Sequence, residues 1–179
     1  MGTIIFLSGF LIPNWLAKTK YLWNKPMWNQ YHTIFLESKT PRSDVMVEKE
    51  LDRLQKLLQQ YPNAVLAGHS LGAWWLSNLA TRDVQINKLV LWTPLSDTNG
   101  FGFNVSNHYC PLIHSPNKNT GSHKVLVYWG TNDLIVPGYN HGRALMDHFS
   151  AMNYKLDGGH LYQKNHQAAL NYMRDWIEI

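Results

Sequence analysis

Residues 64–80 read AVLAGHSLGAWWLSNLA and join a short apolar run to a segment with helical spacing. Residues 64–67 are typical of a buried strand, and the apolar residues after Leu71 recur every three or four positions, as on one face of a helix. Between the two stands Gly68-His69-Ser70-Leu71-Gly72. A Gly-x-Ser-x-Gly between a strand and a helix forms a nucleophile elbow, a strained turn that lifts the serine hydroxyl above the sheet edge. Ser70 is therefore the first candidate for a catalytic nucleophile.

Six strand-like runs alternate with helical segments along the whole chain, which predicts an α/β fold. Most of these runs are continuously apolar, as in strands of a parallel sheet covered on both faces. The clearest helix covers residues 45–60, where Ser43 or Asp44 can cap its start. We expect a doubly wound sheet of about six mostly parallel strands, with a further amphipathic helix over residues 163–177. The strand-like runs are residues 3–7, 33–37, 64–68, 88–92, 124–129 and 154–157.

The length of 179 residues predicts one domain, residues 1–179. Two segments have no clear assignment: residues 10–30, rich in tryptophan, and residues 93–122, rich in Asn, Gly, Ser and Pro. Both follow strand ends, where open α/β sheets bind their ligands. The aromatic residues of the first segment are explained equally well by a substrate pocket and by simple cover for the sheet.

Composition excludes several classes of function. The formal charge is +4 with no basic cluster, which argues against nucleic-acid binding. No run of about 18 apolar residues predicts a membrane span, and the first residues are typical of a core strand rather than a signal peptide. Cys110 is the single cysteine, so we expect no intrachain disulfide and a cytoplasmic location. No ligand pattern indicates a metal ion, and we expect no cofactor. Oligomeric state is left open.

A serine nucleophile needs a base, usually a histidine that a carboxylate holds in place. After a nucleophile elbow, the acid and then the base follow in the chain. Asp133, in the turn after residues 124–129, is the candidate acid. Asp97, which follows the preceding strand, is the competing candidate.

His160 is the candidate base, because it follows the last predicted strand and two glycines that permit a tight backbone path. His166 ranks lower, since it lies within a predicted helix. His69, inside the elbow, is expected to point away from the reaction path of Ser70. Two backbone N–H groups are expected to form the oxyanion hole. They belong to Leu71, at a helix N-terminus, and to Phe10, in the loop after the first strand.

These motifs resemble the α/β-hydrolase superfamily, and the chain is similar to small serine hydrolases of the retinoblastoma-binding protein 9 type. The matching residues are 68–72, 130–137 and 159–160. Three features depart from the family pattern. Ser8-Gly9 stands where many members carry His-Gly, the opening antiparallel strand pair of larger relatives is missing, and the segment after Trp92 has about thirty residues, too few for a lid domain.

The resemblance implies hydrolysis of an ester, thioester or amide through an acyl-enzyme on Ser70, with a small-molecule acyl substrate. Two alternatives stay open. One is a non-catalytic or weakly catalytic binding protein on a hydrolase fold, which uses its Trp-rich segment to bind a partner. The other is an acyltransferase or peptidase with the same three side chains. The substrate itself is not identified.

Overall fold

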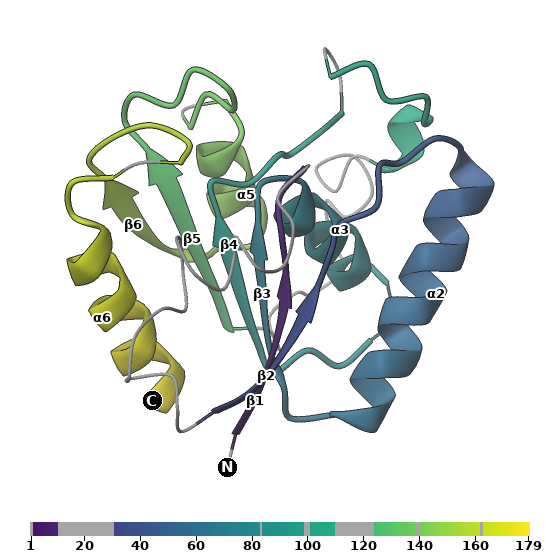
Figure 1. Cartoon of the computed structure of the whole chain (residues 1–179), viewed down its shortest axis with the longest axis horizontal. Helices are drawn as coiled ribbons and strands as arrows, with labels where there is room; N and C mark the ends of the chain where they lie inside the picture. Colours follow the sequence, from purple (N-terminus) through teal and green to yellow (C-terminus); the bar gives the residue numbers. More distant parts are fainter. Residues whose placement is uncertain are drawn as a thin grey trace.

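The computed structural model describes residues 2–10, 31–82, 84–98, 101–109, 124–138, 140–161 and 163–179. Six parallel strands form one sheet in the order β2-β1-β3-β4-β5-β6 (Figure 1). The prediction of an α/β fold with a mostly parallel sheet is confirmed. The strands are β1 (Gly2–Leu7), β2 (Tyr31–Leu36), β3 (Val65–His69), β4 (Lys88–Trp92), β5 (Lys124–Gly130) and β6 (Met152–Leu156).

The strand order places a topological switch point between β1 and β3. From β1 the chain moves to β2 on one side, then returns to β3 on the other side and continues outward to β6. Connections therefore leave the carboxyl ends of β1 and β3 in opposite directions. Such a point opens a crevice above the sheet edge, where α/β proteins bind ligands. The elbow follows β3, and Ser8, Gly9 and Phe10 follow β1, so both candidate oxyanion donors lie at this point.

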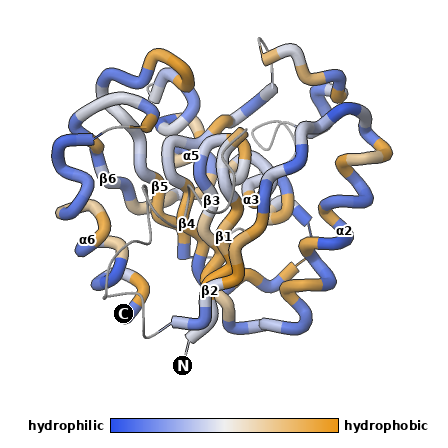
Figure 2. Tube along the Cα trace, viewed as in Figure 1, coloured by the Kyte–Doolittle hydropathy of each residue, from blue (hydrophilic) through white to orange (hydrophobic). Residues whose placement is uncertain are grey.

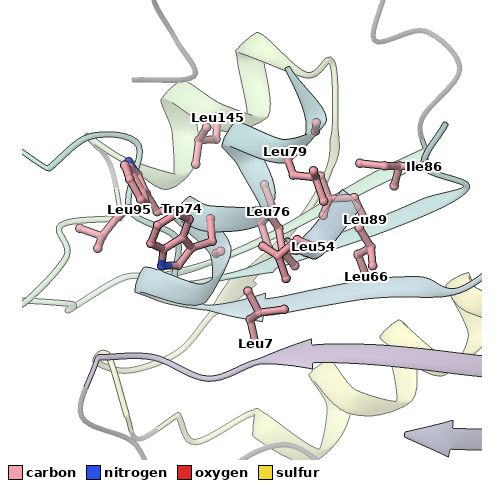
Figure 3. Close-up of a cluster of buried hydrophobic side chains, with 14 of the residues drawn as sticks. Leu7, Leu54, Leu66, Trp74, Leu76, Leu79, Ile86, Leu89, Leu95 and Leu145 are labelled. Atoms are coloured by element: carbon pink, nitrogen blue, oxygen red, sulfur yellow. The ribbon is translucent and has the colours of Figure 1, made fainter. Parts of the chain in front are cut away.

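Alternate residues of each central strand face two separate cores. One core lies between the sheet and the helices α2 (Asp44–Gln60), α3 (Leu71–Ala80) and α5 (Gly142–His148) (Figure 3). The other lies beneath α6 (His166–Glu178), where the hydroxyl of Tyr128 donates to the Ala169 carbonyl oxygen at 2.9 Å. Apolar residues accordingly concentrate along the central strands (Figure 2). Full burial on both faces explains why these strands lack polar alternation.

Local chemistry explains the main helix boundaries. Ser43 caps α2, because its Oγ accepts a hydrogen bond from the Met46 N–H at 3.3 Å. The structure thereby decides between Ser43 and Asp44, the two candidate caps. Every residue of α3 is buried, including Trp74 and Trp75, since this helix packs against both the sheet and α2. Helix α5 was not predicted from the sequence.

Of the two unassigned segments, residues 11–30 lie outside the described ranges, and so do residues 99–100 and 110–123. The described part of the second segment contains a 3₁₀ turn, Asn107–Tyr109. None of the helices in the described part of the chain combines the length and apolar character that a bilayer span requires.

Candidate active site

Ser70 occupies a strained turn between β3 and α3. Its backbone has φ 53° and ψ −115°, a region that non-glycine residues rarely adopt. Two backbone hydrogen bonds hold the turn. The Ser70 N–H donates to the Trp92 carbonyl oxygen at 2.9 Å, and the Ser70 carbonyl accepts from the Trp74 N–H at 3.2 Å. Unlike Ser43, Ser70 does not use its hydroxyl to cap its helix, which leaves that hydroxyl available for chemistry.

Gly72 lets the loop after β1 approach the elbow. A Cβ built on Gly72 would lie 2.6 Å from the carbonyl oxygen of Ser8, a distance that real side chains do not reach. Only glycine therefore permits this contact between the elbow and the β1 loop.

The two predicted oxyanion donors have different surroundings. Leu71 is the first residue of α3, so its N–H has no acceptor within the helix, and the helix dipole favours a developing negative charge nearby. Phe10 is 43% exposed, and its ring meets the ring of Phe103 edge-on, with centroids 5.8 Å apart. Both oxyanion assignments stay predictions.

The structure brings His160 and Asp133 into direct contact. His160 Nδ1 lies 2.7 Å from Asp133 Oδ2, and both residues are buried. The other carboxylate oxygen, Oδ1, accepts from the N–H groups of Ile135 at 3.0 Å and Val136 at 2.8 Å. Because the carboxylate can only accept, the proton of the neutral His160 ring lies on Nδ1. Its Nε2 is then free to accept a proton, as a general base requires.

Asp97, the competing acid, faces a different histidine. Its Oδ2 lies 3.9 Å from His141 Nδ1 and accepts from the Ser96 hydroxyl at 3.4 Å. His141 Nδ1 also accepts from the Ser96 N–H at 3.2 Å. Burial lowers the pKa of His141 and outweighs the opposite effect of the Asp97 and Asp133 carboxylates. The acid in contact with His160 is therefore Asp133.

The elbow and the acid–base pair meet at the carboxyl edge of the sheet, uppermost in Figure 1. The ring of His69, next to Ser70, lies 4.9 Å from the ring of His160 between centroids. Among the described residues there is no hydrogen bond between Ser70 and His160. Such contacts are often long in ligand-free sites and shorten when substrate binds.

Two contacts at this edge were missed by sequence reasoning. His69 Nε2 lies 3.3 Å from the carbonyl oxygen of His160, and Gln163 Nε2 donates to the same oxygen at 3.2 Å. The position of His69 within the elbow was a usable signal for the first contact. The sequence carries no comparable signal for Gln163. In the ranges that the structure covers, no group of three or more His, Cys, Asp or Glu side chains is arranged to hold a metal ion.

The sheet order and the elbow define an α/β-hydrolase fold, and solved structures share it at low sequence identity. The ydeN gene product of Bacillus subtilis is 16% identical and has a TM-score of 0.68, with 100% of both chains covered. Acyl-protein thioesterase 2 of Zea mays is 13% identical and has a TM-score of 0.70, with 99% of this chain and 92% of that chain covered. Est1E of Butyrivibrio proteoclasticus is 14% identical and has a TM-score of 0.67, with 99% and 87% covered.

The family model described as lipase (class 3) matches residues 11–102, which is more than half of the chain. The chain therefore belongs to the lipase (class 3) family. The matched region contains the Ser70 elbow and ends before Asp133 and His160. A search of curated proteins found no match in sequence.

Proposed function

We propose that this protein is a serine hydrolase that cleaves a small carboxylic ester or thioester through an acyl-enzyme on Ser70. The observation that carries the proposal is the buried His160–Asp133 pair, with its ring 4.9 Å from the ring of His69 beside the elbow. A base oriented in this way has its free nitrogen available for a neighbouring hydroxyl. The lipase family and the hydrolase fold agree with this chemistry.

In the proposed reaction, His160 Nε2 takes the proton of Ser70 as Oγ attacks the substrate carbonyl carbon. The Leu71 and Phe10 N–H groups stabilise the resulting oxyanion. His160 then gives the proton to the leaving alcohol or thiol, and the acyl group stays on Ser70. A water molecule, deprotonated by His160, releases the acid and restores the hydroxyl. Asp133 stays ionised and stabilises the imidazolium at each step.

We assign a small acyl substrate because aromatic rings gather beside the loop after β1. Phe101 and Phe103 stack with centroids 6.3 Å apart, and Phe103 also meets Phe10. A few flat rings anchor a short acyl or aryl group through apolar contact. We infer that the protein is a small serine hydrolase similar to the retinoblastoma-binding protein 9 type. We take residues 1–179 as one hydrolase domain that acts in the cytoplasm on a small-molecule substrate.

A fluorophosphonate probe tests the proposal directly, because it reacts with an activated serine. Mass spectrometry of the treated protein should place the adduct on Ser70. Ser70→Ala should abolish both labelling and the hydrolysis of p-nitrophenyl esters, with the fold retained. Ser77→Ala is the matched control, since Ser77 is also buried in this region but uses its hydroxyl to donate to the Ala73 carbonyl oxygen.

Other outcomes would select the alternatives. A folded protein with neither adduct nor turnover would favour a binding protein on a hydrolase fold. An added alcohol or amine could also accept the acyl group. If it speeds up consumption of the ester and the acylated alcohol or amine is formed, the protein is an acyltransferase. Cleavage of peptides rather than esters would favour a peptidase. A series of esters and thioesters from acetyl to palmitoyl separates small from long acyl groups, and a maximum at palmitoyl would contradict the small-substrate assignment.

A further inference from the structure

The backbone carbonyl oxygen of His160 is a double acceptor. His69 Nε2, at the end of β3, lies 3.3 Å from it, and Gln163 Nε2, three residues after His160, donates to it at 3.2 Å. All three residues are buried. A carbonyl oxygen has two lone pairs, so these two donors use its full accepting capacity. The peptide group that carries the His160 side chain is thereby fixed to the end of β3 and to a later residue of its own loop.

The contact defines the tautomer and charge of His69. Because a carbonyl oxygen only accepts, Nε2 of His69 carries the hydrogen. Burial, and to a lesser extent the neighbouring His160, lower the pKa of His69 to about 3. The backbone hydrogen bond to His160 and the Asp133 carboxylate act weakly in the other direction. His69 thus stays neutral at working pH and adds no positive charge beside His160 when that ring is protonated.

Gln163 connects the same carbonyl to helix α6. Its Nε2 donates to the carbonyl oxygens of Gly159 at 2.7 Å and His160 at 3.2 Å. Its Oε1 lies 3.3 Å from Nδ1 of His166, the first residue of α6, and accepts from it. Gln163 also pairs with Gly158 through an isolated bridge. The loop that carries His160 is thus closed on itself and attached to the helix behind it.

The His160 loop needs such restraint because of its composition. Gly158 has φ 149°, and Gly159 follows it, so the unrestrained backbone samples many conformations. Asp133 fixes only the imidazole end of His160. A base must be held within a fraction of an ångström for efficient proton transfer, so its backbone has to be held as well.

We propose that His69 and Gln163 are positioning residues that together hold the His160 backbone carbonyl, and with it the imidazole, towards Ser70, a role that rests on the proposed function. Both side chains hydrogen-bond the backbone of His160. Both act on turnover through His160. His69, at the first x position of the Gly-x-Ser-x-Gly motif, therefore supports the base in this chain.

Removal of one donor tests the proposal at each residue. His69→Leu and Gln163→Met delete a donor and keep the apolar volume. Each should lower kcat by about three- to tenfold, the size of one hydrogen bond, with KM within about twofold of the wild type. The double variant should lose more than the product of the two single losses, because the buried carbonyl then has neither donor.

Conservative variants separate positioning from general damage. His69→Gln keeps an N–H donor at about the same reach and should restore most of kcat, whereas the shorter His69→Asn should not. His148→Gln is the matched control, because His148 lies on α5 and packs on Phe149. It should leave kcat unchanged. If His69→Leu does not fold, the Gln and Asn variants still give the comparison.

A spectroscopic measurement keeps this test independent of turnover. The Nδ1–H proton of His160, bonded to Asp133, should give a low-field NMR signal in the wild type. That signal should broaden or shift in His69→Leu and Gln163→Met, and be retained in His69→Gln. Wild-type kcat and an unchanged signal in both donor deletions would overturn the positioning role alone. A wild type without a Ser70 adduct or turnover would overturn the proposed function, while the NMR comparison still decides whether the two donors hold His160.

Discussion

Two neighbouring histidines at the sheet edge have opposite hydrogen-bond environments. His160 gives its Nδ1–H to the Asp133 carboxylate, and His69 gives its Nε2–H to the His160 carbonyl oxygen. In the first arrangement, His160 Nε2 is able to accept a proton, and the Asp133 carboxylate stabilises the ring once it is protonated. The second leaves a buried neutral ring that, within the described part of the chain, makes no hydrogen bond to a carboxylate. The same side chain is thus suited to proton transfer at one position and to structural support at the other.

The choice between the two candidate acids gives a prediction at this scale. Asp133→Asn should lower kcat by about 10³- to 10⁴-fold, because the amide no longer selects the Nδ1–H tautomer of His160 or stabilises its imidazolium. Asp97→Asn should leave kcat close to that of the wild type, since Asp97 faces His141. Steady-state hydrolysis of a p-nitrophenyl ester measures both. A large loss in Asp97→Asn with normal activity in Asp133→Asn would assign the acid to the other strand.

The candidate side chains differ in how far the sequence could predict them. Ser70 has a local signal, because the elbow needs small residues and a strand-to-helix change within a few positions. Asp133 and His160 follow from chain order combined with strand ends, which parallel strands bring to one edge. The contact of His69 with the His160 carbonyl joins residues 91 positions apart in the chain, and no local pattern encodes it. Gln163 lies only three positions after His160, but its contact depends on how the loop folds.

At the scale of elements, buried strands were predicted most closely. β4 covers the expected residues, because its run of apolar residues ends sharply on both sides. β6 begins at Met152, two residues before the expected start, and its first residues are exposed at the sheet edge, which removes the apolar signal. Helix α5 has only seven residues, too few for a helical period to stand out. Helix α6 begins at His166 and not at residue 163, since Gln163 belongs to the His160 loop.

The end of α5 offers a stabilising substitution. Ser150 has φ 47°, and the N–H groups of Ser150 and Ala151 donate to the carbonyl oxygens of Asp147 and Met146, as in a Schellman motif. Glycine is preferred at such a position. Ser150→Gly should therefore raise the free energy of unfolding by about 0.5–1 kcal/mol. Thermal unfolding should show a Tm increase of roughly 2–4 °C per kcal/mol.

Ser150→Ala is the control for that substitution. Alanine keeps the Cβ that disfavours positive φ, so no increase in Tm is expected. Catalysis should be unchanged in both variants, because the hydrogen bonds of Ser150 lie at the end of α5. Equal Tm values for the glycine and alanine variants would show that backbone strain at this position contributes nothing measurable.

At the scale of the whole molecule, one buried and two partly buried histidines connect the site to acid stability. Burial lowers the pKa of His69, His141 and His148 below the value of an exposed histidine. In the unfolded chain each of them binds a proton near pH 6.5. Below that pH the unfolded state therefore holds more protons than the folded state, and the free energy of unfolding falls as pH falls.

Glu50 titrates at lower pH than the histidines of the unfolded chain, and this sets the lower limit of pH for a measurement of their effect on stability. Burial alone would raise the pKa of Glu50, but hydrogen bonds and charge from Arg53 and Lys39 outweigh it and hold the pKa below its usual value. The stability that this depressed pKa provides is present above the unfolded pKa of about 4.3 and is lost as pH falls through the folded value. Measurements above about pH 5 therefore report mainly on the histidines.

Consider a histidine that stays neutral in the folded state but binds a proton in the unfolded chain. We expect each such histidine to lower the free energy of unfolding by about 1 kcal/mol as the pH falls from about 7.5 to about 5.5. His69 meets this condition most fully, since its folded pKa is about 3. His69→Gln removes the titrating group and keeps a donor for the His160 carbonyl, so its stability should depend less on pH by that amount. Urea unfolding across this range measures the difference. If the wild type and His69→Gln lose the same free energy on acidification, His69 accepts a proton in the folded state, and it cannot then be the neutral support that the His160 loop requires.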